Sequence, residues 1–240
     1  MISKIVASVA ESLADVADGA TVLIGGFGLA GHPIVLIDGL LEHGARDLTI
    51  VSNNAGNGET GLAALIAAGR VRKVICSFPR QSDSWHFDRA YLAGELELEL
   101  VPQGNLAERL RAAGAGIGAF FTPTGVGTPL AEGKEHRVID GTEYILEYPI
   151  HGDVALVGAW RGDRWGNLLY RETARNFNPL MAAAAGTAIA QVDQLVELGE
   201  LDPEAIGSPG LYIDRVVRVP ERPWMRDGVF LGAPAEETGA

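Results

Sequence analysis

Four short apolar runs in the amino-terminal part of the chain constrain its fold most strongly. They lie at residues 21–25, 48–52, 71–76 and 96–101, and each is followed by a turn and a stretch of helical character. The runs at 21–25 and 48–52 are largely apolar and do not alternate strictly, which is typical of parallel strands buried on both faces. Strands that alternate with helices through short connections build βαβ units. The sequence therefore predicts an α/β fold with an open, mostly parallel, doubly wound sheet in a single domain.

Two segments interrupt this alternation. Residues 114–133 are rich in Gly, Pro and Thr and have no helical period, but they contain Phe120 and Phe121, so we expect a functional loop rather than disorder. Residues 220–240 are rich in Pro, Gly and Glu and are expected to form a loosely packed tail after a domain of residues 1–219. The remaining expected strands are 144–149, 154–160, 188–195 and 211–219, and the expected helices are 3–17, 33–43, 58–68, 83–94, 106–113 and 179–185.

The composition excludes several classes of protein. The chain has 240 residues and a formal net charge of -12, so charge will not attract it to nucleic acids or to anionic membrane surfaces. Its single cysteine, Cys76, excludes a disulfide framework and fits a reducing compartment; in its apolar run it is expected to be a buried small side chain. No apolar stretch reaches the ~20 residues that span a bilayer. Together these features predict a cytoplasmic protein. The histidines show no metal-binding spacing, so we expect no metal site.

The first apolar run ends in a glycine-rich turn that contains Gly26-x-Gly28-x-x-Gly31. A dinucleotide-binding turn of this kind also needs an acidic residue at the end of the second strand, which would hold the ribose hydroxyls. Here the second run ends in Ser52-Asn53, so a nicotinamide cofactor is disfavoured. The turn instead predicts a backbone site for an anion or a carbonyl at a helix N-terminus. A purely structural glycine turn is the alternative.

Three polar segments follow the other strands and have two interpretations each. Asn53 and Asn54 lie at the sheet edge where ligands of α/β proteins bind, although Asn also favours plain turns. Gln103 at the start of a helix provides an amide that can donate to an oxyanion, or it caps the helix. Arg80 can bind a carboxylate with two parallel hydrogen bonds, or it is a solvated or salt-bridged side chain.

Four motifs occur in order along the chain: Gly25-Gly26-Phe27-x-x-x-Gly31-x-Pro33, Ser52-Asn53-Asn54-Ala55-Gly56, Pro102-Gln103-Gly104-x-Leu106-Ala107-Glu108-Arg109 and Phe121-Thr122-Pro123-Thr124-Gly125-x-Gly127-Thr128. Together they resemble the A (alpha) subunit of family I 3-oxoacid CoA-transferases, and the similarity runs from about Ser12 to Val219. Residues 57–65 and 76–84 are most similar to the 3-oxoadipate branch of that family, and the succinyl-CoA:acetoacetate and acetate/butyrate branches are the alternatives. The resemblance implies a CoA-transferase fold of the NagB/RpiA-like type.

The resemblance implies ping-pong transfer of CoA from succinyl-CoA to a 3-oxo acid, through a glutamyl-CoA thioester. The CoA thioester is a substrate, and no tightly bound cofactor is expected. In the family the glutamate lies in a Ser-Glu-Asn-Gly motif of the B (beta) subunit, which this chain lacks. Asn53 would stand at the equivalent place, and Glu59 and Glu132 are expected to be solvated. The resemblance therefore implies a beta-subunit partner, and an A2B2 heterotetramer in which residues 114–133 contribute to the interface.

By the same resemblance, Gln103 would stabilise the oxyanion, and residues of the glycine turn, together with Asn53 and Asn54, would line the acyl pocket. We add Arg80 as the residue that holds the distal carboxylate of an oxo-diacid, which acetoacetate does not have. An NAD-dependent oxidoreductase and a non-catalytic ligand-binding or scaffold protein are the alternatives from other classes. The expected substrate-binding residues are Gly26, Phe27, Gly28, Asn53, Asn54 and Arg80.

Overall fold

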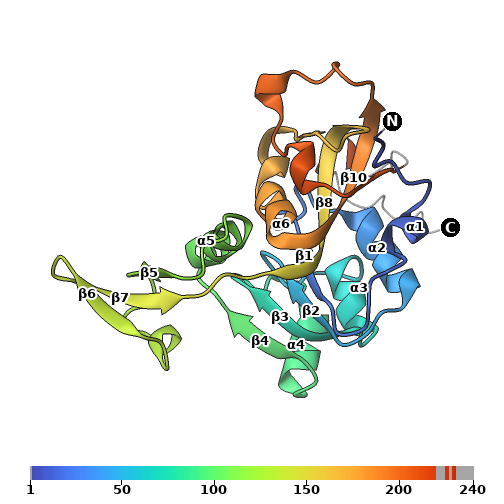
Figure 1. Ribbon diagram of the computed structural model, residues 1–240. Coiled ribbons are helices and arrows are strands. Elements are labelled where there is room, and N and C mark those ends of the chain that lie inside the picture. The colour runs from blue at the N-terminus through green and yellow to red at the C-terminus, as the bar shows by residue number, and fades with distance from the viewer. Residues whose placement is uncertain (1, 220–224, 227–228, 231–240) are drawn as a thin grey trace.

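The computed structural model describes residues 2–219, 225–226 and 229–230, and its centre is one large sheet (Figure 1). Within these residues, seven strands follow the order β11-β10-β8-β1-β2-β3-β4, and β9 pairs with β8 at the side. Every pair along this order is parallel, which confirms the expected open sheet. The strands are β1 (Thr21–Ile24), β2 (Leu48–Val51), β3 (Val71–Cys76), β4 (Glu97–Leu100), β8 (Gly152–Asp163), β9 (Leu168–Leu169), β10 (Ala185–Val196) and β11 (Arg215–Arg218).

Helices cover both faces of this sheet, so the fold is doubly wound (Figure 1). Residues of α1 to α4 pack in one apolar core, and residues of α5 and α6 pack in a second core on the opposite face. Short 3-10 helices connect several elements. The helices are α1 (Val9–Leu13), α2 (Ile34–His43), α3 (Leu62–Ala67), α4 (Trp85–Leu92), α5 (Gln103–Gly114) and α6 (Asn178–Ala184), with η1 (Pro129–Ala131), η2 (Glu172–Arg175), η3 (Pro203–Ala205) and η4 (Gly210–Tyr212).

Side chains of the central strands alternate between the two cores. Val22 and Ile24 of β1 point into the core under α1 to α4, whereas Leu23 between them points toward α5 and α6. Ile50 and Val51 of β2 divide in the same way, and all five side chains are buried. Burial of such a side chain contributes roughly 1.5–3 kcal/mol. This two-sided burial is the reason that the runs of β1 and β2 are largely apolar and do not alternate.

Strand β1 marks the point at which the strand order reverses. From β1 the chain adds β2, β3 and β4 on one side, and later β8, β10 and β11 on the other. Val22 accordingly pairs with Ile50 on one side and with Val154 on the other. In open α/β sheets, ligands bind outside the carboxyl ends of the strands at such a switch point. The glycine-rich turn that follows β1 lies at this position.

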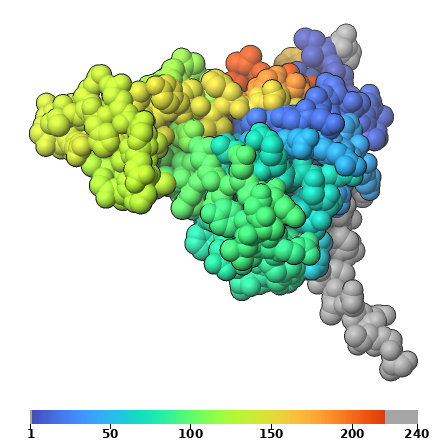
Figure 2. Space-filling model, turned by 90° about the horizontal axis from the view of Figure 1, so that it is seen from below, coloured from blue at the N-terminus to red at the C-terminus, as the bar shows by residue number. Residues whose placement is uncertain are grey.

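Residues 120–147 form a separate antiparallel sheet, which we call the arm. Its strands β5 (Phe120–Thr122), β7 (Thr142–Glu147) and β6 (His136–Ile139) follow in that spatial order. The arm projects from the body of the molecule, in yellow-green in Figure 2. The expectation of an irregular loop over residues 114–133 is therefore wrong at β5, whose partner strand lies beyond that segment. Strand β6 was not predicted either. All four of its side chains are exposed, so no buried face gives its sequence an alternating apolar pattern.

The arm is attached through a buried carboxylate. Glu147 at the end of β7 is buried, and it accepts hydrogen bonds from Lys134 Nζ at 2.6 Å and from Asn105 Nδ2 at 3.3 Å. Asn105, in the first turn of α5, also donates to the carbonyl of Thr124 at 3.3 Å. A buried charge is tolerated only when it is paired and hydrogen-bonded. This network holds the arm against the helix that carries Gln103.

The segment expected as a helix over residues 3–17 contains only the short helix α1. The preceding residues extend the sheet: Val216 of β11 donates its amide to the carbonyl of Lys4 at 2.8 Å. The helix then begins with a capping box, in which Ser8 Oγ accepts from the Glu11 amide at 3.1 Å and the Glu11 carboxylate accepts from the Ala7 amide at 2.8 Å. The Ser-x-x-Glu spacing was the signal for this later start.

The expected tail, residues 220–240, lies largely outside the described residues. Of this segment the structure describes β12 (Met225–Arg226) and β13 (Val229–Phe230), which pair antiparallel. The division into a domain of residues 1–219 and a tail therefore stays a prediction. Within the described residues, no helix has the length and apolar character that a membrane crossing requires.

Candidate functional site

The loops that follow β1, β2, β3 and β4 lie next to one another at the carboxyl edge of the sheet, because these strands are parallel neighbours. They carry, in order, the glycine turn, Asn53 with Asn54, Arg80 and Gln103. The topology thus brings together the four segments that the sequence singled out. The loop with Arg80 lies between the loop with Asn53 and the loop with Gln103.

The loops after β2 and β3 are joined by hydrogen bonds. The amides of Ser77 and Phe78 donate to the carbonyl of Asn53 at 3.2 and 3.1 Å. Further along, Ser84 Oγ donates to the carbonyl of Gly56 at 3.1 Å. Because both ends of the later loop are tied to the earlier one, the two loops form one structural unit at the sheet edge.

The glycine turn folds back on itself after β1. Phe27 and Ala30 exchange backbone hydrogen bonds at 3.0 and 3.1 Å, which closes a tight hairpin. Gly26 has a φ of 113° and Gly28 a φ of 60°, values that side chains rarely permit. Within the described residues, the amides of Gly26 and Gly28 make no hydrogen bond, and the ring of Phe27 is half-exposed. The turn therefore has two unpaired amide donors beside an apolar side chain, of which Gly26 is buried and Gly28 is half-buried.

The helix that follows the turn does not offer its amides to a ligand. Gln191 of β10 is buried, and its Oε1 accepts from the amides of Val35 at 3.0 Å and Leu36 at 3.1 Å. The Ile34 amide donates to the carbonyl of His32 at 2.9 Å. The expected anion site at the helix N-terminus is therefore wrong, because a distant side chain already caps α2. The free donors belong to the turn itself.

Two asparagines, one just before α6 and one at its first position, hold the glycine turn in place by hydrogen bonds. Neither was predicted from the sequence. Asn178 is fully buried, donates to the carbonyl of Gly31 at 3.0 Å and accepts from the amide of Gly158 at 2.9 Å. Asn176 Nδ2 donates to the carbonyl of Ala30 at 3.0 Å. The signal was an Asn-x-Asn-Pro segment at the start of the expected helix 179–185, but its partners lie far away in sequence. These contacts fix the turn over β8.

His32 lies buried between the turn and the loop after β2. A β-carbon on Gly26 would lie 2.9 Å from its Cδ2, and one on Gly61 would lie 3.7 Å from its Cε1. Within the described residues, neither ring nitrogen has a hydrogen-bond partner. Burial lowers the pKa of His32 to about 4, because the charged form would lose its hydration. The imidazole is therefore neutral at pH 7.

The two asparagines after β2 are both buried and have different roles. Asn53 Nδ2 donates to Ser77 Oγ at 3.1 Å. Asn54 Oδ1 accepts from the amide of Gly56 at 2.8 Å, which is an Asx turn. The interpretation of Asn54 as a turn residue is therefore confirmed. The turn uses only Oδ1, so Nδ2 of Asn54 can still bind a ligand. No carboxylate stands at either position.

Gln103 is the first residue of α5 and is exposed. The residue that caps the helix is Pro102, and no side-chain hydrogen bond closes this end. Within the described residues the Gln103 carboxamide makes no hydrogen bond. The capping interpretation is therefore wrong, and the amide is available to a ligand at this edge.

Two carboxylates near this edge, Glu59 and Glu132, are exposed, and the thiol of Cys76 is buried. Glu59 accepts from Trp85 Nε1 at 3.0 Å and pairs with His86 Nε2 at 2.7 Å, and these hydrogen bonds lower its pKa. The Glu59 side chain is 70% exposed, as expected, although the two hydrogen bonds tie its carboxylate to α4. Glu132 is exposed. Cys76 is buried, which raises the pKa of its thiol to about 12 and makes it a poor nucleophile.

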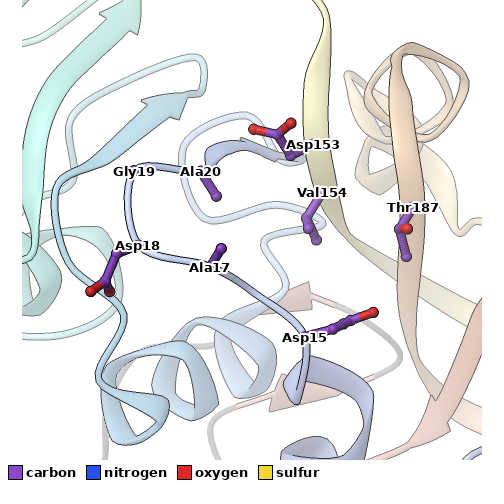
Figure 3. Close-up of a pocket in the computed structure, with 8 residues that line it drawn as sticks. All are labelled: Asp15, Ala17, Asp18, Gly19, Ala20, Asp153, Val154 and Thr187. Carbon is purple, nitrogen blue, oxygen red and sulfur yellow. The ribbon is translucent and has the colours of Figure 1, made fainter.

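A surface hollow lies at the opposite, amino edge of the sheet (Figure 3). Its acidic residues already have partners: Asp153 accepts from the Thr21 amide at 2.7 Å, and Asp18 accepts from the Arg46 amide at 2.7 Å. They hold strand ends and loops in place. Among the described residues, no group of three or more His, Cys, Asp and Glu side chains is arranged to bind a metal. The carboxyl edge is thus the candidate site.

Comparison with known proteins agrees with this geometry. The sequence pattern of the coenzyme A transferase family matches residues 6–219, nearly the whole chain. The chain belongs to the coenzyme A transferase family. Members of this family take CoA thioesters as substrates, so the oxidoreductase and non-catalytic alternatives are excluded.

Two family members of known name show how specific the likeness is. The A (alpha) subunit of the 3-oxoadipate CoA-transferase of Pseudomonas putida is 67% identical, over 91% of this chain and 95% of its own length. The alpha subunit of the probable succinyl-CoA:3-ketoacid coenzyme A transferase of Bacillus subtilis is 50% identical, over 89% of both chains. Both relatives are named as one subunit of a larger enzyme, so this chain corresponds to the alpha subunit of such an enzyme.

A solved structure shows the same fold in a longer chain. The acyl-CoA transferase of Escherichia coli O157:H7 matches with a TM-score of 0.83 and 24% identity. The match covers 97% of this chain but only 49% of the E. coli chain. This chain therefore corresponds to about half of that transferase, and the CoA-transferase fold class expected from the sequence is confirmed.

Proposed function

We propose that this chain is the alpha subunit of a heteromeric enzyme that transfers CoA from succinyl-CoA to a 3-oxo acid, with 3-oxoadipate favoured. The observation that carries the proposal is an edge that, among the described residues, has uncommitted hydrogen-bond donors and an amide, that of Asn53, where a nucleophilic carboxylate would be needed. The donors are the Gln103 carboxamide and the amides of Gly26 and Gly28. The 67% identity to the alpha subunit of a 3-oxoadipate CoA-transferase supports the choice of acceptor.

The nucleophile is proposed to come from the beta subunit. Asn53, at the end of β2, has a neutral amide that cannot attack a thioester, and Glu59 is held by Trp85 and His86. A glutamate in a Ser-Glu-Asn-Gly motif of the partner would supply the missing carboxylate. Attack on the acyl-CoA forms an acyl-glutamyl anhydride and releases the CoA thiolate, which then attacks the glutamyl carbonyl. This exchange gives the glutamyl-CoA thioester and frees the first carboxylic acid.

The donors of this chain are proposed to act on the charge that develops during attack. As the thioester carbonyl becomes tetrahedral, its oxygen takes up negative charge. The Gln103 amide would donate a hydrogen bond to that oxygen, and loss of one such donor costs about 3 kcal/mol of the barrier. The backbone of Gly26, Phe27 and Gly28 would line the acyl pocket, with Asn53 and Asn54 beside it.

The acceptor is proposed to be a diacid because Arg80 lies on the loop after β3, which is flanked by the loop that carries Asn53 and the loop that carries Gln103. Its guanidinium would hold the distal carboxylate of 3-oxoadipate. Acetoacetate has no such group. The second candidate is a succinyl-CoA:3-ketoacid or acetate/butyrate transferase, which the 50% identity to the B. subtilis protein favours. An A2B2 assembly and a cytoplasmic location complete the proposal.

The test is CoA transfer from succinyl-CoA by this chain co-purified with its beta subunit, with 3-oxoadipate or acetoacetate as acceptor. A strong preference for 3-oxoadipate is expected. A preference for acetoacetate would leave the mechanism in place and favour the second candidate. Absence of transfer to any carboxylic acid by the assembled complex would contradict the proposed function.

A further inference from the structure

The guanidinium of Arg80 is held on one side by a carboxylate of the next helix. Arg80 Nε lies 2.7 Å from Asp88 Oδ1, and Nη2 donates to Asp88 Oδ2 at 2.8 Å. Two parallel hydrogen bonds of this kind fix the plane of the guanidinium as well as its position. The arginine is therefore held in one orientation on an otherwise exposed loop.

The Arg80 group keeps unused hydrogen-bonding capacity. A guanidinium carries five N–H donors, and the contact with Asp88 uses one on Nε and one on Nη2. The remaining N–H groups include a parallel pair on the edge between Nη1 and Nη2. The Arg80 side chain is 70% exposed, whereas that of Asp88 is 30% exposed. This free edge can donate two hydrogen bonds to a second carboxylate.

Asp88 itself has a firm backbone position. It lies in the first turn of α4, where its amide donates to the carbonyl of Ser84 at 3.0 Å. The loop before it is tied to the Asn53 loop, because Ser84 Oγ donates to Gly56 and the Gly58 amide donates to the carbonyl of Asp83 at 2.9 Å. The position of the Arg80–Asp88 pair is thus fixed relative to Asn53.

We propose that Asp88 is a positioning residue for acceptor specificity: it holds Arg80 so that the Nη1–Nη2 edge receives the distal carboxylate of a diacid substrate. This inference rests on the proposed function and adds a residue that does not itself touch the substrate. A monoacid acceptor such as acetoacetate would gain nothing from the arrangement.

Asp88 has two opposite effects on such a substrate, and they lead to opposite predictions. Its contacts orient the guanidinium, which favours diacid binding. Its negative charge repels the incoming carboxylate, which opposes binding. If orientation is its main effect, Asp88→Asn weakens diacid binding. If repulsion dominates, the same change strengthens it. The direction of the change therefore decides between the two.

The experiment compares acceptors in the complex assembled with the beta subunit. Asp88→Asn, Asp88→Ala and Arg80→Ala are assayed with 3-oxoadipate and with acetoacetate, and both acceptors are run with the same succinyl-CoA donor. The ratio of the two acceptor kcat/KM values cancels any effect on the donor half-reaction. Asp15→Asn is the control, since Asp15 also accepts two hydrogen bonds from one guanidinium, from Nη1 and Nη2 of Arg215, away from the candidate site.

For Asp88→Asn we expect the ratio to fall about tenfold, through a higher KM for 3-oxoadipate and an unchanged kcat, since hydrogen bonds to charged groups are among the stronger ones. Arg80→Ala should lower the ratio further, and Asp15→Asn should leave it unchanged. A selective loss in Arg80→Ala with no loss, or a gain, in Asp88→Asn would overturn the role of Asp88 alone. Equal losses for both acceptors in Arg80→Ala would overturn the diacid subsite with it. Failure of the wild-type complex to transfer CoA would instead contradict the proposed function.

Discussion

Asn178 occupies the space in which a β-carbon on Gly25 would lie: such a carbon would come within 1.9 Å of Asn178 Oδ1. The glycine at the end of β1 is thus required by a buried amide that comes from the other half of the chain. That amide also contacts Gly31 and Gly158, so one side chain joins the glycine turn to β8.

Asn178→Leu should destabilise the protein by about 3 kcal/mol, because it leaves the Gly158 amide and the carbonyls of Gly31 and Ala174 buried without partners. The free energy of unfolding from urea titration measures this loss. Asn176→Ala, which removes a contact to the same turn from a less buried position, should cost less. Equal stability of Asn178→Leu and wild type would refute the supporting role.

His32 should make the protein sensitive to mild acid. Its pKa is about 4 in the folded state, below the ordinary value of 6.5. Between these values the unfolded chain binds a proton that the folded chain does not, so stability falls as the pH is lowered from about 6.5 toward 4. His32→Met removes this contribution.

The measurement is the difference in unfolding free energy between His32→Met and wild type across pH 4 to 7. The difference isolates His32 from His136, whose pKa is raised by Glu143 and whose contribution has the opposite sign. We expect the variant to gain relative stability as the pH falls. A difference that is constant with pH would show that His32 is solvated in the folded protein.

Gln103→Ala should lower kcat of the assembled complex by about a hundredfold, since the proposed oxyanion donor contributes roughly 3 kcal/mol. Its side chain is exposed and makes no contact that supports the fold within the described residues, so the melting temperature should not change. Glu108→Ala on the same helix is the control, because it removes only an exposed pair with Arg111. A loss confined to KM would mean that Gln103 binds the ground state and does not act on the oxyanion.

Glu59→Gln should leave the glutamyl-CoA intermediate intact. The carboxylate is already bonded to Trp85 and His86, and a nucleophile is expected only in the partner. The complex is incubated with succinyl-CoA that is labelled in its CoA moiety, and separation of the subunits then locates the label. Label on the beta subunit in both the variant and the wild type is the expected result, and its disappearance in the variant would give Glu59 a catalytic role.

The sequence predicted the elements whose signal is local. Residues 48–51 are all buried in β2, and residues 74–76 of β3 are apolar and buried, because both faces of the sheet are covered. The topology followed from the alternation of strands and helices. The site segments were found because parallel neighbouring strands end at one edge.

The features that were missed depend on contacts between distant segments. Gln191 caps α2 from a strand more than 150 residues away, and no local pattern marks it as a cap. Lys4 joins the sheet through Val216, so an apparently helical stretch is extended. The edge strand β6 has only exposed side chains and relies on β7 for its hydrogen bonds. In each case tertiary pairing overrides local propensity.

The central place of β1 has a consequence for how the chain folds as it is made. Val22 finds its first partner, Ile50, soon after synthesis, but its second, Val154, emerges only when more than half of the polypeptide is complete. Until then the backbone groups on one edge of β1 have no partner strand. Such long-range pairing slows folding and leaves the nascent amino-terminal half prone to association. Chaperone binding during translation should therefore end once residues 152–163 have left the ribosome.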